Sequence, residues 1–181
     1  MDPQEHERFR DFVDARWSAL LRLANLLTGG DRHEAEDLVQ IALMKALGRW
    51  GHVDDPEGYV RKVMYRHQIS RWRLRRPHRE ATFAAPPQDL GVADGTAAAD
   101  LRISVAQALA RLTPRQRTML VLRYFEDLSE TEVASVLGCS VGTVRSTTHR
   151  SLSRLRSLAP ELGAPVQTAA LSNSVPKGAH T

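Results

Sequence analysis

Apolar residues recur every three or four positions in the first part of the chain, the spacing that places side chains on one face of an α-helix. One such stripe covers residues 9–27 and ends before Gly29. A second covers residues 35–50 and follows Asp31, a residue type that caps helices by accepting a backbone N–H. A third begins at Pro56, because proline suits the first helical position. The pattern therefore predicts three successive helices.

The second part of the chain carries a denser set of helix start and stop signals. Apolar positions resume at Leu101, and Thr113 with the proline after it opens another helix. Ser129, with a glutamate three residues later, forms a capping box before a short helix that Gly138 can end. Ser140 can then cap a longer helix. A short helix, a tight turn and a longer helix predict a helix-turn-helix.

Composition divides the chain between these two groups of helices. Residues 81–100 contain seven Ala, two Pro and two Gly, so 11 of 20 positions have small or helix-breaking side chains. Such a segment buries too little apolar surface to offset the entropy of ordering it. We predict an all-α protein with two small helical domains, residues 1–80 and 101–159, a flexible linker over 81–100 and a disordered tail over 160–181.

Positive charge is concentrated near the end of the third predicted helix. The whole chain has 25 Lys and Arg against 21 Asp and Glu, whereas residues 61–80 have eight basic residues and a single acid, Glu80. A solvated helix face is the simple explanation. However, Tyr65 and Trp72 are interleaved with the cations, as on surfaces that stack bases and neutralise phosphates. This segment is therefore a candidate nucleic-acid surface.

The second helix of the predicted helix-turn-helix also suits DNA. Such a helix enters the major groove, where arginine can pair with guanine. Hydroxyl side chains there can hydrogen-bond to base edges or position the helix on the DNA. Its expected exposed residues are Thr143, Arg145, Ser146, Thr147, Thr148, His149 and Arg150. The alternative is an ordinary helical hairpin with a basic outer face. The aromatic residues Trp17, Trp50, Tyr124 and Phe125 fall on apolar stripes and are expected in the core.

Several function classes are not supported by the sequence. The single cysteine, Cys139, cannot form an internal disulfide, and the histidines lack metal-ligand spacing. No phosphate-binding loop or catalytic constellation is present, so we expect no metal, no cofactor and no enzyme activity. No stretch is apolar enough to span a membrane, and the start of the chain lacks a secretion signal. A cytoplasmic protein is expected.

Three strings in the second half resemble a known family. LTPRQR from Leu112, SETEVA from Ser129 and LGCSVGTVRS from Leu137 look like region 4 of the bacterial extracytoplasmic-function (ECF) sigma factors, members of the sigma-70 family. In the first half, AEDLVQ from Ala35 is similar to their region 2. The order region 2, linker, region 4 is the minimal architecture of that group.

The resemblance implies a subunit that binds core RNA polymerase, directs it to promoters and opens the DNA. By this analogy Asp37 and Gln40 contact the polymerase. The residues implied at the minus-ten element are Tyr65, Arg66, Arg71, Trp72, Arg73, Arg75 and Arg76. A loop with His52, Val53, Asp54 and Asp55 would hold a flipped base, and Thr143, Arg145, Ser146, His149 and Arg150 would contact the minus-thirty-five element.

The resemblance also allows control of the chain by an anti-sigma factor. Two alternative functions stay open at this point. A stand-alone helix-turn-helix regulator would bind a two-fold symmetric operator as a dimer and would need no polymerase. A decoy that imitates a sigma factor would titrate an anti-sigma protein, but it would need neither the basic segment at 61–80 nor a cationic recognition helix. Both of these features are present.

Overall fold

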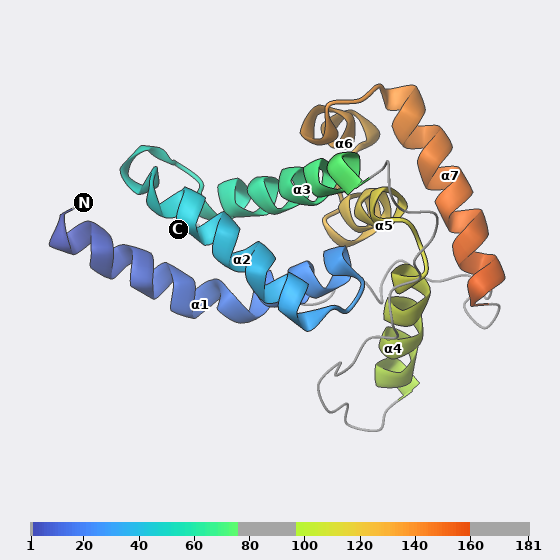
Figure 1. Cartoon of the computed structure of the whole chain (residues 1–181), viewed down its shortest axis with the longest axis horizontal. Helices are drawn as coiled ribbons and strands as arrows, with labels where there is room; N and C mark the ends of the chain where they lie inside the picture. Colours follow the sequence, from blue (N-terminus) through green and yellow to red (C-terminus); the bar gives the residue numbers. More distant parts are fainter. Residues whose placement is uncertain (1, 76–96, 160–181) are drawn as a thin grey trace, which may run out of the picture.

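The computed structural model describes residues 2–75 and 97–159, with the side chains of residues 2–71 and 104–159, and this part of the chain is all-α, as predicted. The N-terminal unit and the C-terminal unit, defined as residues 2–75 and 97–159, follow each other along the chain (Figure 1). Their elements are α1 (Pro3–Thr28), α2 (Arg32–Leu47), the 3-10 turn η1 (Trp50–His52), α3 (Pro56–Arg75), α4 (Ala97–Ala110), α5 (Pro114–Leu120), the π-helical turn η3 (Val121–Phe125), α6 (Glu130–Leu137) and α7 (Val141–Leu158).

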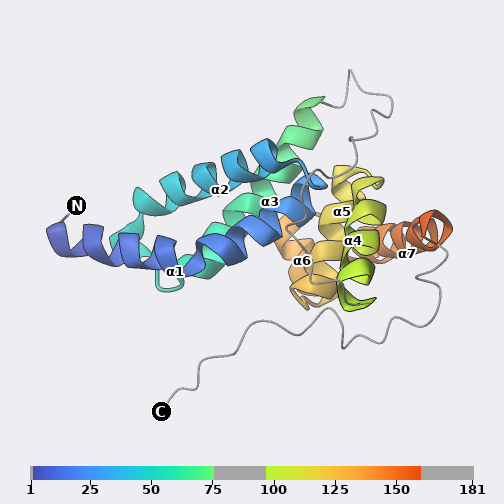
Figure 2. The same ribbon diagram turned by 90° about the horizontal axis from the view of Figure 1, so that it is seen from below.

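The N-terminal unit consists of three helices that pack side by side (Figure 2). Helix α1 ends at Gly29, whose φ of 81° is a left-handed conformation that favours glycine. Asp31 then caps α2, its carboxylate accepting the Glu34 N–H at 2.9 Å. At the far end, Trp50 packs edge-on against Phe9 with ring centroids 5.0 Å apart. Local signals therefore set the turn between α1 and α2, whereas a contact between residues far apart in the sequence packs the second turn against α1.

The C-terminal unit contains the predicted helix-turn-helix, formed by α6 and α7. Ser129 and Glu132 form the capping box at the start of α6, and Gly138 ends this helix with φ of 62°. Ser140 caps α7 by accepting the Thr143 N–H at 3.1 Å. Helix α7 projects away from the N-terminal unit, at the right of Figure 1. The turn thus presents one whole side of α7 outward.

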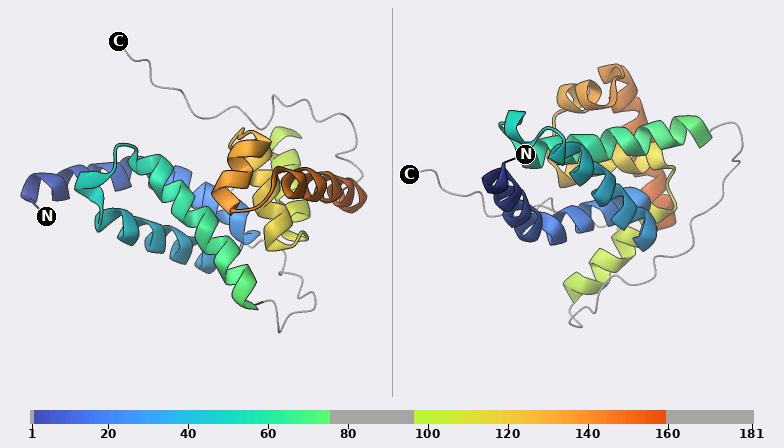
Figure 3. Two further views of the ribbon diagram at one scale, coloured as in Figure 1. Left: turned by 90° about the horizontal axis from the view of Figure 1, so that it is seen from above. Right: turned by 60° about the vertical axis from the view of Figure 1, so that its left-hand side comes forward.

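The two units share one continuous hydrophobic core. This core contains residues of α1, α2 and α3 together with Met119, Leu122 and Val133 of the C-terminal unit. Helices α5 and α6 pack on α3, and α1 also contacts α4 and α5 (Figure 3). Although the sequence divides into two groups of helices, the two groups lie packed on each other in this structure.

Three expectations about local structure are wrong. Helix α4 begins at Ala97, inside the expected linker, because its run of alanines favours helix. Thr147 and Thr148, expected at the surface, are buried because they share a face of α7 with Val144. Tyr124 and Phe125 are partly exposed rather than in the core.

The position of those two aromatics follows from η3. In this turn the Glu126 N–H bonds to the Val121 carbonyl at 3.0 Å, five residues back instead of four. The extra residue rotates the apolar stripe away from the core. The rest of the expected linker and the expected disordered tail, residues 160–181, lie outside the described residues. Among the residues described, no helix has both the length and the apolar content needed to cross a membrane.

Candidate nucleic-acid interface

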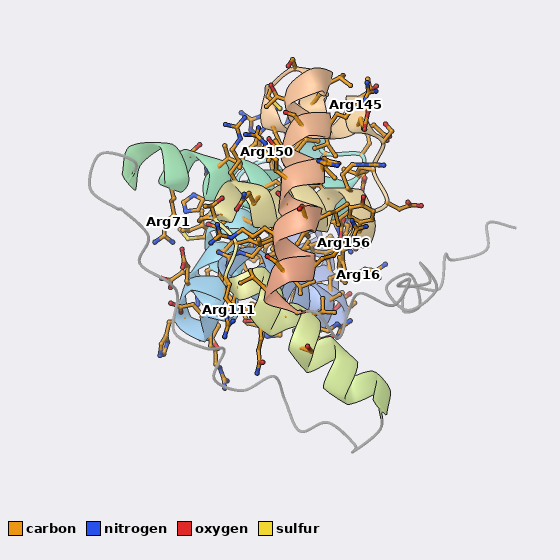
Figure 4. All side chains as sticks on the ribbon, turned by 90° about the vertical axis from the view of Figure 1, so that its right-hand side faces the viewer. Arg16, Arg71, Arg111, Arg145, Arg150 and Arg156 are labelled. Atoms are coloured by element: carbon orange, nitrogen blue, oxygen red, sulfur yellow. The ribbon has the colours of Figure 1, made fainter. Side chains whose placement is uncertain are left out.

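Helix α7 has one buried and one exposed side. Val144 and Ser151 are fully buried against the rest of the C-terminal unit. The opposite side carries Arg145, Ser146, His149 and Arg150, all exposed, with Thr143 half-buried at the start. Figure 4 shows the labelled side chains of Arg145, Arg150 and Arg156 along this helix. The structure therefore brings together the five residues predicted for the minus-thirty-five element.

The arginines of this exposed face have only surface interactions. Arg145 pairs with Glu130 of α6 at 2.9 Å, and this hydrogen-bonded carboxylate raises the pKa of Arg145 above its ordinary value. Arg150 donates to the Ser146 carbonyl at 3.1 Å. Exposed ion pairs contribute little stability, because water screens the two charges. A DNA phosphate or guanine edge can therefore replace these partners at low cost.

Helix α3 presents its predicted DNA residues in different environments. Arg66 is exposed, and Arg71 pairs with Glu34 of α2 at 3.0 Å. Tyr65, in contrast, is only 4% exposed, and burial together with the nearby Glu126 carboxylate raises the pKa of its hydroxyl. It does not reach the surface in this conformation. Trp72, Arg73 and Arg75 belong to the last turns of α3, beyond the described side chains, and Arg76 lies outside the described residues.

The loop before α3 combines exposed polar residues with a structural cap. His52 ends η1, and both His52 and Asp54 are exposed, whereas Val53 is half-buried. Asp55 accepts the Gly58 N–H at 2.9 Å and so caps α3. The four residues predicted to hold a flipped base are thus adjacent, but one of them already has a structural role.

Helix α2 has an exposed face opposite the core. Asp37 and Gln40, the residues predicted to contact polymerase, both lie on it, one turn apart. Met44, one turn further, is 72% exposed, a large apolar side chain left in water. Met44 was not among the predicted contact residues, although its spacing from Gln40 was a readable signal.

The sequence analysis did not predict two polar contacts between the units, those of Arg61 and Arg117. Arg61 of α3 donates to both carboxylate oxygens of Glu126 at 2.5 and 2.6 Å. Burial alone would lower the pKa of Arg61, but Glu126 and Glu57 outweigh burial and raise it. Arg117 of α5 is buried, and this burial lowers its pKa to about 10. Contacts between residues far apart in sequence have no local signature.

Metal-binding chemistry has no support in the described parts of the chain. No group of three or more His, Cys, Asp or Glu residues is close enough there to hold an ion. Cys139 is half-buried in the turn between α6 and α7, where it packs against the core. The chemistry that this surface offers is hydrogen bonding and positive charge.

Comparison with known proteins identifies similar chains. Residues 102–155 match the family described as Sigma-70, region 4. The chain is 40% identical to an RNA polymerase sigma-E factor of Streptomyces avermitilis over 151 residues, 82% of this chain and 83% of the relative. It is 30% identical to the ECF RNA polymerase sigma factor SigL of Mycobacterium tuberculosis over 166 residues, 85% of this chain and 90% of the relative.

A solved structure has the same fold. It is the sigma factor RpoE from Bartonella quintana, crystallised in complex with the anti-sigma factor NepR. The TM-score is 0.56 at 24% identity, and the match covers 84% of this chain and 96% of that one. The similarity extends over both helical units.

Proposed function

This chain belongs to the ECF RNA polymerase sigma factors, a family that acts in transcription initiation, and we propose that it binds core RNA polymerase, directs it to specific promoters and promotes DNA opening. The observation that carries the proposal is the exposed basic face of α7 in a helix-turn-helix that matches region 4. We propose that residues 1–80 act as region 2 and residues 101–159 as region 4.

Helix α7 is the proposed reader of the minus-thirty-five element. Its first three turns carry Arg145, Ser146, His149 and Arg150, whose side chains face solvent. The N-terminal part of a recognition helix is the part that faces base edges. Thr143 is proposed to contact the phosphates and so position the helix on the DNA. The buried side of α7 holds the helix in place, so these side chains need little reorganisation on binding.

Helix α3 and the loop before it are the proposed site for the minus-ten element. Extruding a base from the stack costs a few kcal/mol, so opening without ATP requires tight binding of the exposed strand. The basic segment of α3 supplies phosphate contacts and Trp72 supplies a stacking surface, whereas Tyr65 is buried in this conformation. The loop from His52 to Asp55 would accept the flipped base.

The exposed face of α2 is the proposed contact with core polymerase. Asp37 and Gln40 supply polar contacts, and Met44 adds apolar surface beside them. Protein interfaces usually bury apolar side chains at their centre and surround them with polar ones. Binding of polymerase would bury Met44 in this way. An anti-sigma protein is a further proposed partner, because the RpoE sigma factor of similar fold forms a complex with the anti-sigma factor NepR.

Two alanine variants test the DNA assignment directly. The double variant Arg145→Ala, Arg150→Ala removes two exposed cations of α7 without touching its buried side. We expect promoter-dependent transcription with the core polymerase of Streptomyces avermitilis, whose sigma-E factor is similar to this chain, to fall at least tenfold. Each lost base contact costs about 1–3 kcal/mol. The control Arg22→Ala removes an exposed arginine of α1. Unchanged transcription in the double variant would remove the site assignment.

Two further variants test the polymerase contact. Asp37→Ala and Gln40→Ala should weaken binding to core polymerase while the unfolding transition stays in place, because both side chains are exposed. Tight binding of duplex DNA by the isolated chain, with no affinity for core polymerase, would instead favour a stand-alone regulator.

A further inference from the structure

An ion pair joins the two helices of the helix-turn-helix beside the face proposed to bind DNA. The Oε2 atom of Glu130 accepts a hydrogen bond from Nε of Arg145 at 3.2 Å and another from its Nη2 at 2.9 Å. Glu130 is the first residue of α6, and Arg145 lies near the start of α7 (Figure 4). The first helix of the motif therefore holds an arginine that the second helix is proposed to insert into the DNA.

This ion pair adds little to the stability of the motif. The side chain of Arg145 is 73% exposed and that of Glu130 is 30% exposed, so water screens their charges. Helices α6 and α7 are held together by apolar residues of the common core, among them Val133, Leu137 and Val144. The motif can therefore fold without the pair, and the effect of the pair on Arg145 itself can be considered separately.

Glu130 occupies only one edge of the planar guanidinium. A guanidinium has five N–H groups, and the carboxylate accepts from the one on Nε and from one of the two on Nη2. The other edge, formed by Nη1 and the second N–H of Nη2, donates to no group in the described parts of the chain. Two N–H groups of one edge are what arginine uses to pair with guanine O6 and N7. Base reading therefore does not require the carboxylate to leave.

The carboxylate restricts the orientations that the guanidinium can adopt. A free arginine side chain samples many rotamers, and ordering it on binding lowers affinity. Because the guanidinium is planar, two hydrogen bonds on one edge also fix the direction of the opposite edge. When DNA covers the pair and excludes water, the attraction between the two charges becomes stronger. Glu130 thus constrains Arg145 most firmly in the bound complex.

The carboxylate also favours base reading over phosphate binding. An unrestrained arginine can contact any phosphate, and such a contact is the same for every DNA sequence. To reach a phosphate Arg145 would have to leave Glu130, and an unpaired carboxylate would then face the negatively charged DNA. Pairing with guanine through the free edge keeps the carboxylate neutralised. The difference between these two outcomes increases sequence discrimination.

We propose that Glu130 is a positioning residue that sets base specificity at the minus-thirty-five element by holding Arg145 in the orientation that pairs with guanine. This inference rests on the proposed role of α7 in reading that element. It extends base recognition to α6, none of whose residues was predicted to take part in DNA binding.

Sequence selection by the holoenzyme tests the proposal. The full chain is combined with core polymerase of Streptomyces avermitilis, and the duplexes bound from a random-sequence library are sequenced. Arg145→Ala should abolish a guanine preference at one position, which identifies the base that Arg145 reads. Glu130→Ala should lower the guanine preference at that same position at least about threefold and leave the other positions unchanged. Glu130→Gln should retain more of the preference than Glu130→Ala, because an amide oxygen still accepts from the guanidinium.

Asp127→Asn serves as the matched control for charge. It removes one negative charge at an exposed position three residues before Glu130. The φ of Asp127 is 53°, a left-handed conformation that asparagine also adopts. This variant should select the same sequences as the wild type. The positioning role is overturned if Asp127→Asn loses the same preference, or if Glu130→Ala keeps it.

Affinity for the unselected library separates positioning from a merely structural role. This affinity reports contacts with phosphates, which do not depend on sequence. Glu130→Ala should bind the unselected library at least as tightly as the wild type, because it removes a negative charge and frees Arg145 for phosphates. An equal loss of affinity for selected and unselected duplexes would show that Glu130 only supports the fold.

Failure of the proposed function would give a different result. If Arg145→Ala selects the same sequences as the wild type, the proposed role of Arg145 is wrong, and that of Glu130 falls with it. If Arg145→Ala loses a base preference that Glu130→Ala keeps, only the inference about Glu130 is wrong.

Discussion

Gly29 lies directly against the guanidinium of Arg117: a Cβ added to this glycine would be 2.0 Å from Arg117 Nη1. The glycine ends α1 in a left-handed conformation, and the arginine donates to the carbonyl of Leu27, two residues earlier. The end of a helix in the N-terminal unit therefore has the shape that admits a cation from the C-terminal unit.

Gly29→Ala should destabilise the protein by about 1–3 kcal/mol, because it combines an unfavourable backbone conformation with a clash against a buried side chain. Gly48→Ala is the matched control. Gly48 ends α2 with φ of −66°, and its nearest neighbours would be 3.9 Å from an added Cβ. Chemical denaturation of both variants measures the difference. Equal stability of the two variants would contradict the described contact.

The capping box of the helix-turn-helix gives a second stability prediction. Ser129 accepts the Glu132 N–H at 3.2 Å, while the Glu132 carboxylate accepts the Ser129 N–H at 2.8 Å. Ser129→Ala removes one of these bonds and should cost about 1 kcal/mol in thermal or chemical unfolding. Ser153→Ala, at an exposed position inside α7, is the control. A loss no larger than in that control would show that the box does not stabilise α6.

The fold was predicted well wherever the determining signal is local. The caps at Asp31, Thr113, Ser129 and Ser140 all form the predicted hydrogen bonds. Each involves residues within three positions, so residue type and spacing suffice. The π-helical turn was not predicted, because no single residue marks a change of hydrogen-bond register.

The candidate site was predicted in part for the same reason. The exposed face of α7 follows from helix periodicity and residue type once a helix-turn-helix is identified. Thr147 and Thr148 of α7 were misplaced, since polar side chains were assumed to face solvent. The Arg61–Glu126 pair joins residues 65 positions apart, and only tertiary packing brings them together. Nothing in the sequence pattern could identify Arg117 as a contact between units.

Acid conditions should weaken the N-terminal unit through His67. Burial, with the charges of Arg71 and Lys45, lowers the pKa of this histidine below its ordinary value of 6.5. The folded state therefore favours the neutral imidazole. This contribution is fully present above the unfolded pKa and is lost as pH falls through the lower folded value.

The free energy of unfolding measured between about pH 7.5 and about pH 5.5 should thus fall more for the wild type than for His67→Gln. His33→Gln, at an exposed position of α2, should follow the wild type. Parallel curves for wild type and His67→Gln would contradict the predicted direction.

The contribution of the planar guanidinium of Arg145 to DNA binding can be separated from that of its positive charge. Arg145→Lys keeps one positive charge but loses the planar fork that pairs with guanine through two hydrogen bonds. We expect promoter affinity of the holoenzyme to drop about tenfold, with an unchanged slope of affinity against salt. Titrations at several salt concentrations measure both quantities. An affinity equal to the wild type would mean that Arg145 does not read a base in this way.

The proposed sites all depend on one function, which is that this chain directs core RNA polymerase to promoters. The decisive experiment combines the purified chain, core polymerase and genomic DNA from the same source, and maps the 5′ ends of the transcripts. We predict starts that require the chain, follow two common motifs at a fixed separation, and disappear with Arg145→Ala, Arg150→Ala. If the transcripts begin at the same positions with and without the chain, this function is contradicted.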